Sequence, residues 1–99
     1  MVKIKLVGCS FNQASKKSYE GEIVKLVREP SNKFDPNAIM VLNGLGEKIG
    51  YVGTAKTVSF GNRKNGCIDN IELNDIMPAQ GRGIITKFKE YFGFIEVDC

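Results

Sequence analysis

The stretch from Val27 to Val52 constrains the fold of this chain most strongly. An apolar segment, Glu22–Arg28, leads into Arg-Glu-Pro, and the proline ends it because proline cannot donate to the hydrogen-bond ladder of a sheet. Two further segments, Ala38–Leu42 and Lys48–Val52, have the composition of strands. The residues between them read Asn-Gly-Leu-Gly and tolerate positive φ, so we expect a tight hairpin there.

The remainder of the chain adds further elements. Val2, Ile4 and Leu6 alternate with two lysines, which predicts a half-buried strand that ends at Gly8. Residues 12–20 are polar and are expected to form a loop. Three later segments predict a short helix capped by Thr54 and running to about Phe60, a fifth strand containing Ile68, Ile71, Leu73 and Ile76, and a closing hairpin of Gly83–Lys89 with Tyr91–Val97.

Together these elements predict a mainly β protein. We expect a small OB-like or SH3-like β-barrel of about six strands, with one or two short helices. Closing the sheet into a barrel removes the exposed edges that an open meander would leave. A chain of 99 residues with 42% hydrophobic content suits one domain, which we place at residues 1–99.

The composition argues against catalysis. The chain has no histidine, which removes the usual zinc sites and the Ser-His and Cys-His nucleophile pairs. Its 3 cysteines, Cys9, Cys67 and Cys99, are far apart in sequence, so we expect reduced thiols. The acidic residues are too dispersed to indicate a magnesium cluster. We therefore expect no metal, no cofactor and no enzymatic activity.

The net charge of +3 is unevenly distributed along the chain. Residues 1–64 hold 11 Lys and Arg against 5 Asp and Glu, whereas residues 65–99 hold 3 against 6. A positive face suits a phosphate backbone, but on charge alone a solvated surface without a partner is the simpler interpretation. No apolar run reaches membrane-spanning length and the first residues do not resemble a signal peptide, so we expect a cytoplasmic protein, associated with the nucleoid if it is bacterial.

Residues 30–37 form the loop most suited to binding. Prolines fix φ at both of its ends, so it should hold one shape. Phe34 stands between polar residues, and it either packs into the core, which composition favours, or offers a surface on which a ligand stacks. Asp35 either accepts backbone N–H groups of the turn, which composition favours, or contacts a ligand, and its two oxygens allow both.

The run VREPSNKFDPNAIMV, followed by GEKIGYV, resembles the signature of the HIRAN domain family. That signature has a hydrophobic strand, Arg-(Glu/Asp)-Pro, an Asn-containing turn, aromatic-Asp-x-Asn-Ala-Ile, and a Gly-aromatic or Gly-His step. Lys5–Gly8 also fits the first strand of the family. The resemblance covers about residues 4–58, and beyond them only the strand pattern agrees.

The resemblance implies an OB-like barrel and a specific ligand. In eukaryotic fork-remodelling helicases of the helicase-like transcription factor type, the domain captures the 3′-hydroxyl end of single-stranded DNA. Carried onto this chain, Phe11 and Phe34 match the two stacking aromatics, and Asp35 matches the acceptor of the hydroxyl. Asn32 matches a turn asparagine near the end, and Lys56 is placed to meet a phosphate.

The chain also departs from the family pattern. Both stacking positions are phenylalanine rather than tyrosine, which keeps the aromatic face and loses the hydroxyl. Ser10 stands in place of an arginine, which removes a phosphate contact, and Ser31 replaces the first asparagine of the turn. Tyr51 occupies a position where some members have histidine.

The C-terminal hairpin has a second, less specific similarity. Its aromatic residues resemble those of cold-shock domains, which stack on single-stranded bases. The hairpin lies at the end of this chain rather than near its start, so packing of Phe88, Phe92 and Phe94 in the core is the favoured interpretation.

We predict a single-stranded DNA-binding module that recognises 3′-OH ends, in repair, replication or mobile-element processing. A separate helicase or nuclease is the expected kind of partner. The alternative is a protein-interaction module on the same barrel with no nucleic-acid ligand, and a steep loss of binding with salt would distinguish the first from the second. The predicted DNA-binding residues are Phe11, Asn32, Lys33, Phe34, Asp35, Tyr51, Lys56, Arg63 and Lys64.

Overall fold

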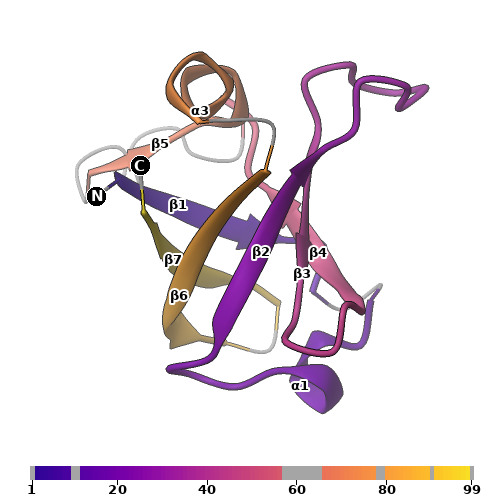
Figure 1. Cartoon of the computed structure of the whole chain (residues 1–99). Helices are drawn as coiled ribbons and strands as arrows, with labels where there is room; N and C mark the ends of the chain where they lie inside the picture. Colours follow the sequence, from indigo (N-terminus) through magenta and orange to yellow (C-terminus); the bar gives the residue numbers. More distant parts are fainter. Residues whose placement is uncertain (1, 10–11, 57–65, 78–79, 90, 99) are drawn as a thin grey trace.

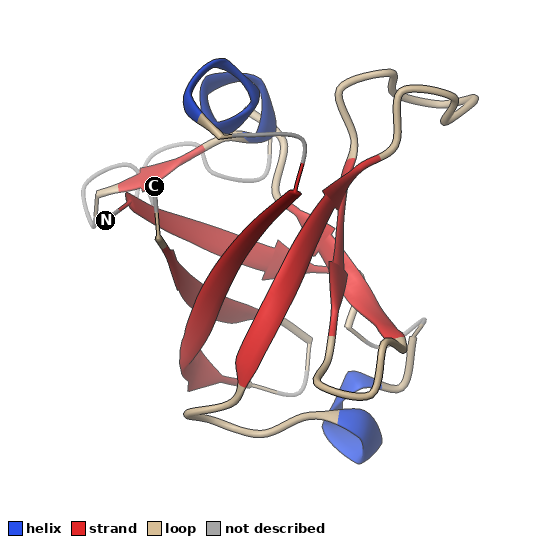
Figure 2. Cartoon of the chain, viewed as in Figure 1, coloured by secondary structure: helices blue, strands red, loops and turns tan. Residues whose placement is uncertain are grey.

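Six strands close into a barrel in the computed structural model of the chain, which describes residues 2–9, 12–56, 66–77, 80–89 and 91–98 (Figures 1 and 2). The ring runs in the order β4-β3-β2-β6-β7-β1, and β1 pairs with β4 to complete it. A two-residue strand, β5, pairs in parallel with β1 outside the ring. The strands are β1 (Val2–Val7), β2 (Ile23–Arg28), β3 (Ile39–Leu42), β4 (Lys48–Val52), β5 (Cys67–Ile68), β6 (Gln80–Phe88) and β7 (Gly93–Val97). The predicted mainly β barrel is confirmed.

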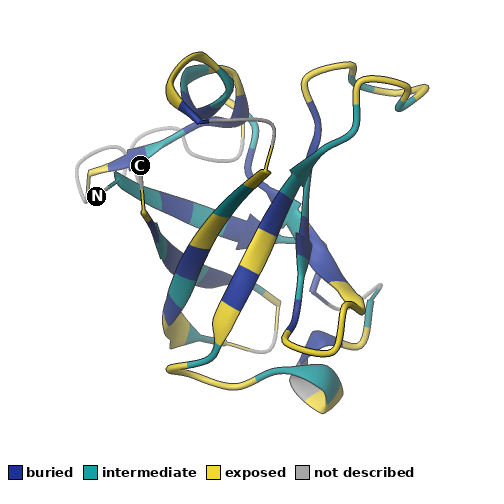
Figure 3. Cartoon of the chain, in the orientation of Figure 1, coloured by how far each residue is buried: buried dark blue, intermediate teal, exposed yellow. Residues whose placement is uncertain are grey.

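The core fills the inside of the barrel. Alternate residues of each strand face inward, so Ile4 and Leu6 of β1 and Leu26 of β2 are completely buried while Lys25 is exposed. Figure 3 shows this alternation of buried and exposed positions along β2 and β6. Because side chains fill the inside of the barrel, the loops at its two ends are the segments free to carry function.

The ring closes where β1 meets β4. Only two register pairs join these strands, Leu6 with Val52 and Val7 with Tyr51. Gly50 allows the close approach, because a Cβ at that position would lie 2.3 Å from the carbonyl oxygen of Val7 and 2.9 Å from the Leu6 side chain. We call this short β1–β4 contact the seam.

The predicted hairpins are confirmed. Residues 43–46 join β3 to β4, with Gly46 at a φ of 83°. The buried Asn43 supports the turn, since its Oδ1 accepts the backbone N–H groups of Leu45 and Glu47. The closing hairpin is formed by β6 and β7, with β6 beginning three residues earlier than Gly83.

Two expectations about the local structure were wrong. Residues 12–20 were expected to be loop, but they contain one helical turn, α1 (Ala14–Lys17), in which the buried Ala14 donates its N–H to the carbonyl of Cys9 at 2.9 Å. The expected fifth strand keeps only Ile68, in β5, because the residues after it form the helix α3 (Asn70–Ile76).

The helix α3 forms because Asp69 caps it. The Asp69 carboxylate accepts the N–H of Glu72 at 2.9 Å, which satisfies a donor that the first helical turn leaves open. Leu73 and Met77 are four residues apart and face the core, whereas Ile71 and Ile76 are about half exposed. The expected helix from Thr54 is seen only as a turn at residues 55–56, since 57–60 lie outside the described residues.

The connecting segments gather at the two ends of the barrel. The loop 29–38 and α3 lie at one end, and the β3–β4 turn and α1 lie at the other (Figure 1). Among the described helices, none is long and apolar enough to span a membrane.

Candidate nucleic-acid interface

A groove of about 440 Å³ lies where the loop 29–38 meets the seam and the start of α3. One wall comes from the loop, the floor from residues of β1 and β4, and the far wall from Thr54, which follows β4, and from Asn70 of α3. The lining residues are Val7, Asn32, Phe34, Asp35, Ala38, Tyr51, Val52, Thr54 and Asn70. We call it the loop groove.

Asn32 shapes the loop from within. Its Oδ1 accepts the backbone N–H groups of Phe34 at 2.9 Å and Asp35 at 3.0 Å, so both lone pairs of that oxygen are used. Its amide nitrogen donates to Oε1 of Glu29 at 3.0 Å. These contacts hold the backbone of the two following residues in one conformation, so Asn32 positions its neighbours.

Asp35 presents a fixed carboxylate to the loop groove. Its Oδ1 accepts the backbone N–H of Asn37 at 2.9 Å, and its Oδ2 accepts the side-chain amide of Asn70 at 2.9 Å. The side chain is half-buried, and each oxygen keeps one lone pair for a further donor. The predicted turn contact is present, and the second oxygen is held from the other side of the groove.

Asn70 is a site residue that is absent from the predicted set. It is 1% exposed, and its amide also donates to the carbonyl of Asn37 at 3.1 Å. It occupies the first position of α3, so it reaches the loop only because that segment is helical. The signal that could have located it is Asp69 followed three residues later by Glu72, which is typical of a helix N-terminus.

Arg28 fixes α3 against the barrel. Its guanidinium donates to the carbonyls of Asn74 and Met77, at the C-terminal end of the helix, where a cation also complements the helix dipole. Within the described residues its buried Nε has no hydrogen-bond partner. The arginine of the Arg-Glu-Pro motif therefore positions the helix that carries Asn70, and through it the carboxylate of Asp35.

Phe34 is 97% exposed at the mouth of the loop groove. The expectation of core packing, which composition favours, is wrong: Asn32 fixes the backbone of Phe34 in a loop that projects from the end of the barrel (Figure 1). An aromatic ring held in water by an ordered loop is available for stacking.

Tyr51 lines the floor of the groove with its ring held in place. Its hydroxyl donates to Oε1 of Glu29 at 3.0 Å, and the Lys48 ammonium lies 5.1 Å from the ring centroid. The same Glu29 oxygen also accepts from Asn32, so one carboxylate joins the loop to β4.

Four of the nine predicted site residues therefore meet in one groove: Asn32, Phe34, Asp35 and Tyr51. Lys33 and Lys56 are exposed and do not line it. Phe11, Arg63 and Lys64 lie outside the described residues, so their proposed roles stay predictions, as does DNA contact by the four in the groove.

A basic and aromatic surface follows the outer face of β1 away from the groove. Lys5 lies two residues before the groove-lining Val7, and its ammonium is 4.9 Å from the centroid of the Phe92 ring. Lys3 stands 5.9 Å from the centroid of Phe94, and the two rings meet edge to face at 5.7 Å. The expectation of core packing is confirmed for Phe88 but is wrong for Phe92 and Phe94, which are half-buried on the outside.

The described cysteines are not placed for chemistry. Cys9 and Cys67 are both buried and unpaired. Burial raises the pKa of the Cys9 thiol to about 11, more than its backbone hydrogen bond lowers it. Burial also raises the pKa of Cys67, although nearby Lys3 and Lys5 act against that shift. In the described part of the chain, no group of three or more His, Cys, Asp or Glu residues could hold a metal ion.

Comparison with known proteins agrees with the barrel fold. The chain is similar in structure to the HIRAN domain of human HLTF, with a TM-score of 0.61 and 18% identity, over 97% of this chain and 71% of that one. It is also similar to a protein from Lactobacillus plantarum, with a TM-score of 0.67 and 19% identity, over 98% of this chain and 89% of that one. No curated protein matches it by sequence. The model of the HIRAN domain matches residues 1–63, which is more than half of the chain and includes the whole loop 29–38, and the chain belongs to the HIRAN domain family.

Proposed function

We propose that this protein binds single-stranded DNA and recognises its 3′-hydroxyl end in the loop groove. HIRAN domains are known as DNA-binding domains and are not catalytic by themselves. The observation that carries the proposal is the pairing of Phe34, 97% exposed on an ordered loop, with the fixed carboxylate of Asp35 beside it. A ring and an acceptor at the mouth of one groove match the base and the hydroxyl of a terminal nucleotide.

Phe34 supplies the part of the affinity that does not depend on sequence. Every base has a flat π-face, and stacking on an aromatic side chain contributes about 1–3 kcal/mol per base. The loop is already ordered by Asn32, so little conformational entropy is lost when the base stacks. Phe11 is the second stacking residue in the proposal.

Asp35 supplies the preference for the end. A 3′-hydroxyl can donate to the free lone pair of a carboxylate oxygen, whereas a 3′-phosphate has no such donor and repels the negative charge. The N–H of Asn37 and the amide of Asn70 hold the carboxylate in place, so it needs no rearrangement to accept the hydroxyl. In this proposal Asn32 shapes the loop and Asp35 reads the hydroxyl.

The strand that leads to the end passes over the outer face of β1. Lys5 and Lys3 lie on the same face as Val7, and they offer cations for phosphates next to the rings of Phe92 and Phe94. The phosphate backbone of the DNA is also attracted by the positive field of Lys33, Lys56, Arg63 and Lys64. Tyr51 forms the floor under the terminal sugar.

The test is fluorescence anisotropy of a labelled oligothymidine that ends in either a 3′-OH or a 3′-phosphate, at low and moderate salt. We expect the 3′-OH form to bind about tenfold or more tightly, with affinity falling as salt rises. Asp35→Ala should weaken binding of the 3′-OH form and remove the difference between the two ends. Asp75→Ala, which deletes an exposed carboxylate on α3, should change neither.

Two results would contradict the proposal. Equal affinity of the folded protein for both ends would show a general strand binder that does not read the hydroxyl. Absence of binding to either oligonucleotide by a folded protein would show that the loop groove serves another ligand.

A further inference from the structure

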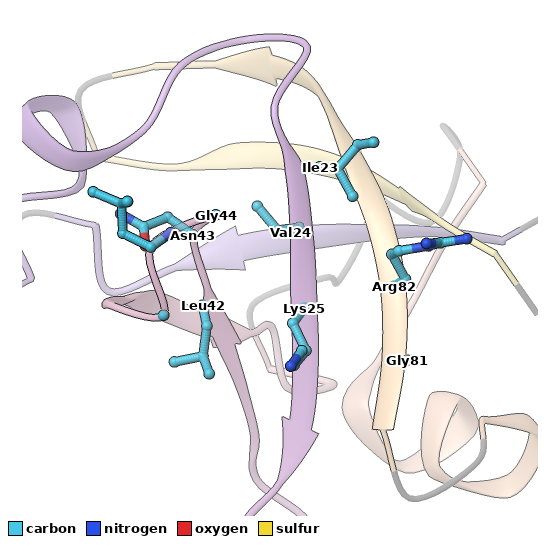
Figure 4. A pocket seen from close by; sticks show the side chains of 10 residues that line it. Ile23, Val24, Lys25, Leu42, Asn43, Gly44, Gly81 and Arg82 are labelled. Carbon is cyan, nitrogen blue, oxygen red and sulfur yellow. The ribbon is translucent and has the colours of Figure 1, made fainter.

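A second groove, of about 390 Å³, lies on the outside of the barrel at the opposite end of β3 from the loop groove. It runs along β2 and β6 beside the β3–β4 turn, and Figure 4 shows its side chains on these neighbouring strands. The two grooves share no lining residue. We call it the β2–β6 groove, lined by Ile23, Val24, Lys25, Leu42, Asn43, Gly44, Leu45, Gly46, Gly81 and Arg82.

The walls of the β2–β6 groove expose aliphatic surface. Ile23 is 59% exposed and Leu45 is 85% exposed. Leu42 of β3 is half-buried and lies opposite Lys25 of β2. Exposed large aliphatic residues that line one hollow indicate a surface that is covered by a partner.

Two cations lie side by side on neighbouring strands of this groove. Lys25 of β2 and Arg82 of β6 are directly opposite in the antiparallel register, and like charges at such positions destabilise a sheet. Neither forms an ion pair with a carboxylate of the described residues, and no acidic side chain lines the groove. A carboxylate from outside the chain would relieve their repulsion.

Two carboxylates at the edge of the groove already accept hydrogen bonds within the chain, Glu22 from the backbone N–H of Gly44 and Glu47 from the side-chain amide of Asn43. Two further acidic residues lie in an adjoining hollow. That hollow, of about 310 Å³, shares Ile23 and Arg82 with the groove and is otherwise lined by Gly83, Ile84, Glu96 and Asp98. The two carboxylates there would repel an anionic ligand. An anionic ligand would therefore bind on the Lys25 side of the groove, away from these two carboxylates.

From these observations we propose that the β2–β6 groove binds an extended, acidic segment of a partner protein in which aliphatic side chains flank a carboxylate. The aliphatic side chains cover Ile23, Leu42 and Leu45, and the carboxylate lies between Lys25 and Arg82. Nucleic acid is disfavoured, because none of the lining residues is aromatic and bases would have no surface on which to stack. Since the two grooves lie at opposite ends of β3, both ligands can be bound at once.

The experiment uses isotope-labelled protein and a panel of short peptides that combine leucine or isoleucine with glutamate or aspartate. Acidic peptides should shift the backbone amides of Ile23, Lys25, Leu45 and Arg82 in a saturable manner and leave those of Phe34 and Asp35 unchanged. Peptides with lysine in place of every acidic residue should produce no shift.

Variants separate charge from apolar contact. Lys25→Glu should weaken binding of the acidic peptides at least about tenfold, and the fold should persist because the substitution places opposite charges across β2 and β6. Ile23→Ser should weaken the same binding without a change of charge. Lys89→Glu changes the charge equally at an exposed position away from the groove and serves as the control.

Several outcomes would overturn the proposal. One is that no acidic peptide of the panel shifts these amides at millimolar concentration. Another is that binding survives Lys25→Glu. Shifts of the same amides on dilution of the protein alone would show that a second copy of the chain covers the groove, and shifts caused by oligothymidine would show that it contacts phosphates.

Discussion

At the scale of single residues, Phe34 and Asp35 are neighbours in sequence with opposite surroundings. Phe34 is almost fully in water, while Asp35 is half-buried and held by two hydrogen bonds. The loop thus separates a side chain that is free to meet a ligand from one that is already oriented. This separation allows the two contributions to binding to be measured independently.

Phe34→Ala should weaken binding of oligothymidine by about 1–3 kcal/mol, or roughly five- to 150-fold, because it removes one stacked base. The midpoint of thermal unfolding should stay unchanged, since the side chain is 97% exposed. Anisotropy and calorimetry measure the two quantities. Phe34→Tyr keeps the aromatic face and should bind like the wild type, and a Phe34→Ala variant with full affinity would exclude stacking at this residue.

Cys9 should be unreactive as long as the protein is folded. With its pKa raised to about 11, the thiol at pH 8 is almost entirely protonated, so iodoacetamide should label it about a hundredfold more slowly than in urea. Because the folded pKa lies above the unfolded value of about 8.5, the stability that Cys9 contributes is fully present below pH 8.5 and is lost as the pH rises toward 11. Peptide mass spectrometry of the labelled protein measures the rate, and equal labelling of folded and unfolded protein would contradict the burial of this thiol.

At the scale of elements, α3 connects the barrel to the site. Arg28 holds its C-terminal end, and Asn70 at its first position holds Asp35. The helix is only seven residues long, so its stability depends on these contacts and on the burial of Leu73 rather than on helix propensity.

Asn70→Ala should lower the free energy of unfolding by about 1–3 kcal/mol, because a buried hydrogen-bond donor to two acceptors is lost. It should also reduce the discrimination between 3′-OH and 3′-phosphate ends, since the carboxylate of Asp35 is then held from one side only. Asn74→Ala is the matched control, because Asn74 donates to the carbonyl of Asn37 and not to the carboxylate of Asp35. Equal effects of the two variants on end discrimination would show that Asn70 does not act through Asp35.

The same element shows where sequence reasoning succeeds and where it stops. The strands up to Val52 and the β3–β4 turn could be predicted, because alternation of apolar residues and the Asn-Gly-Leu-Gly turn are local signals. The residues of α3 resemble a strand when their apolar pattern is considered without the capping residue Asp69. Asn70 could not be linked to Asp35 from sequence, since their contact depends on how Arg28 packs the helix. The exposure of Phe34 could not be predicted either, because composition favours the core and the ordered loop overrides it.

At the scale of the whole molecule, the barrel depends on the seam between β1 and β4. Gly50 is the residue without which these two strands cannot approach each other, since the nearest obstacle to a Cβ is the backbone oxygen of Val7. A closed ring needs every one of its pairings, so strain at this position affects the entire sheet.

Gly50→Ala should therefore destabilise the folded state by about 1–3 kcal/mol or more, as overpacking against backbone does. Gly44→Ala is the control, because a Cβ there would meet only the side-chain end of Glu22 at 3.1 Å. Urea unfolding of both variants measures the difference. A Gly50→Ala variant as stable as Gly44→Ala would show that the seam accommodates a Cβ at this position without strain.

The position of the loop groove over the seam has a consequence for slow motion. Val7 and Tyr51 form one of the two register pairs of the seam, and both also line the loop groove. In the proposed complex, a nucleotide in the groove would contact both β1 and β4 and would hold these two strands together at the seam. Because a ligand raises the cost of any opening that releases it, amide hydrogen exchange at this pair should slow in proportion to ligand occupancy, whereas exchange in the β2–β6 pairing should respond less.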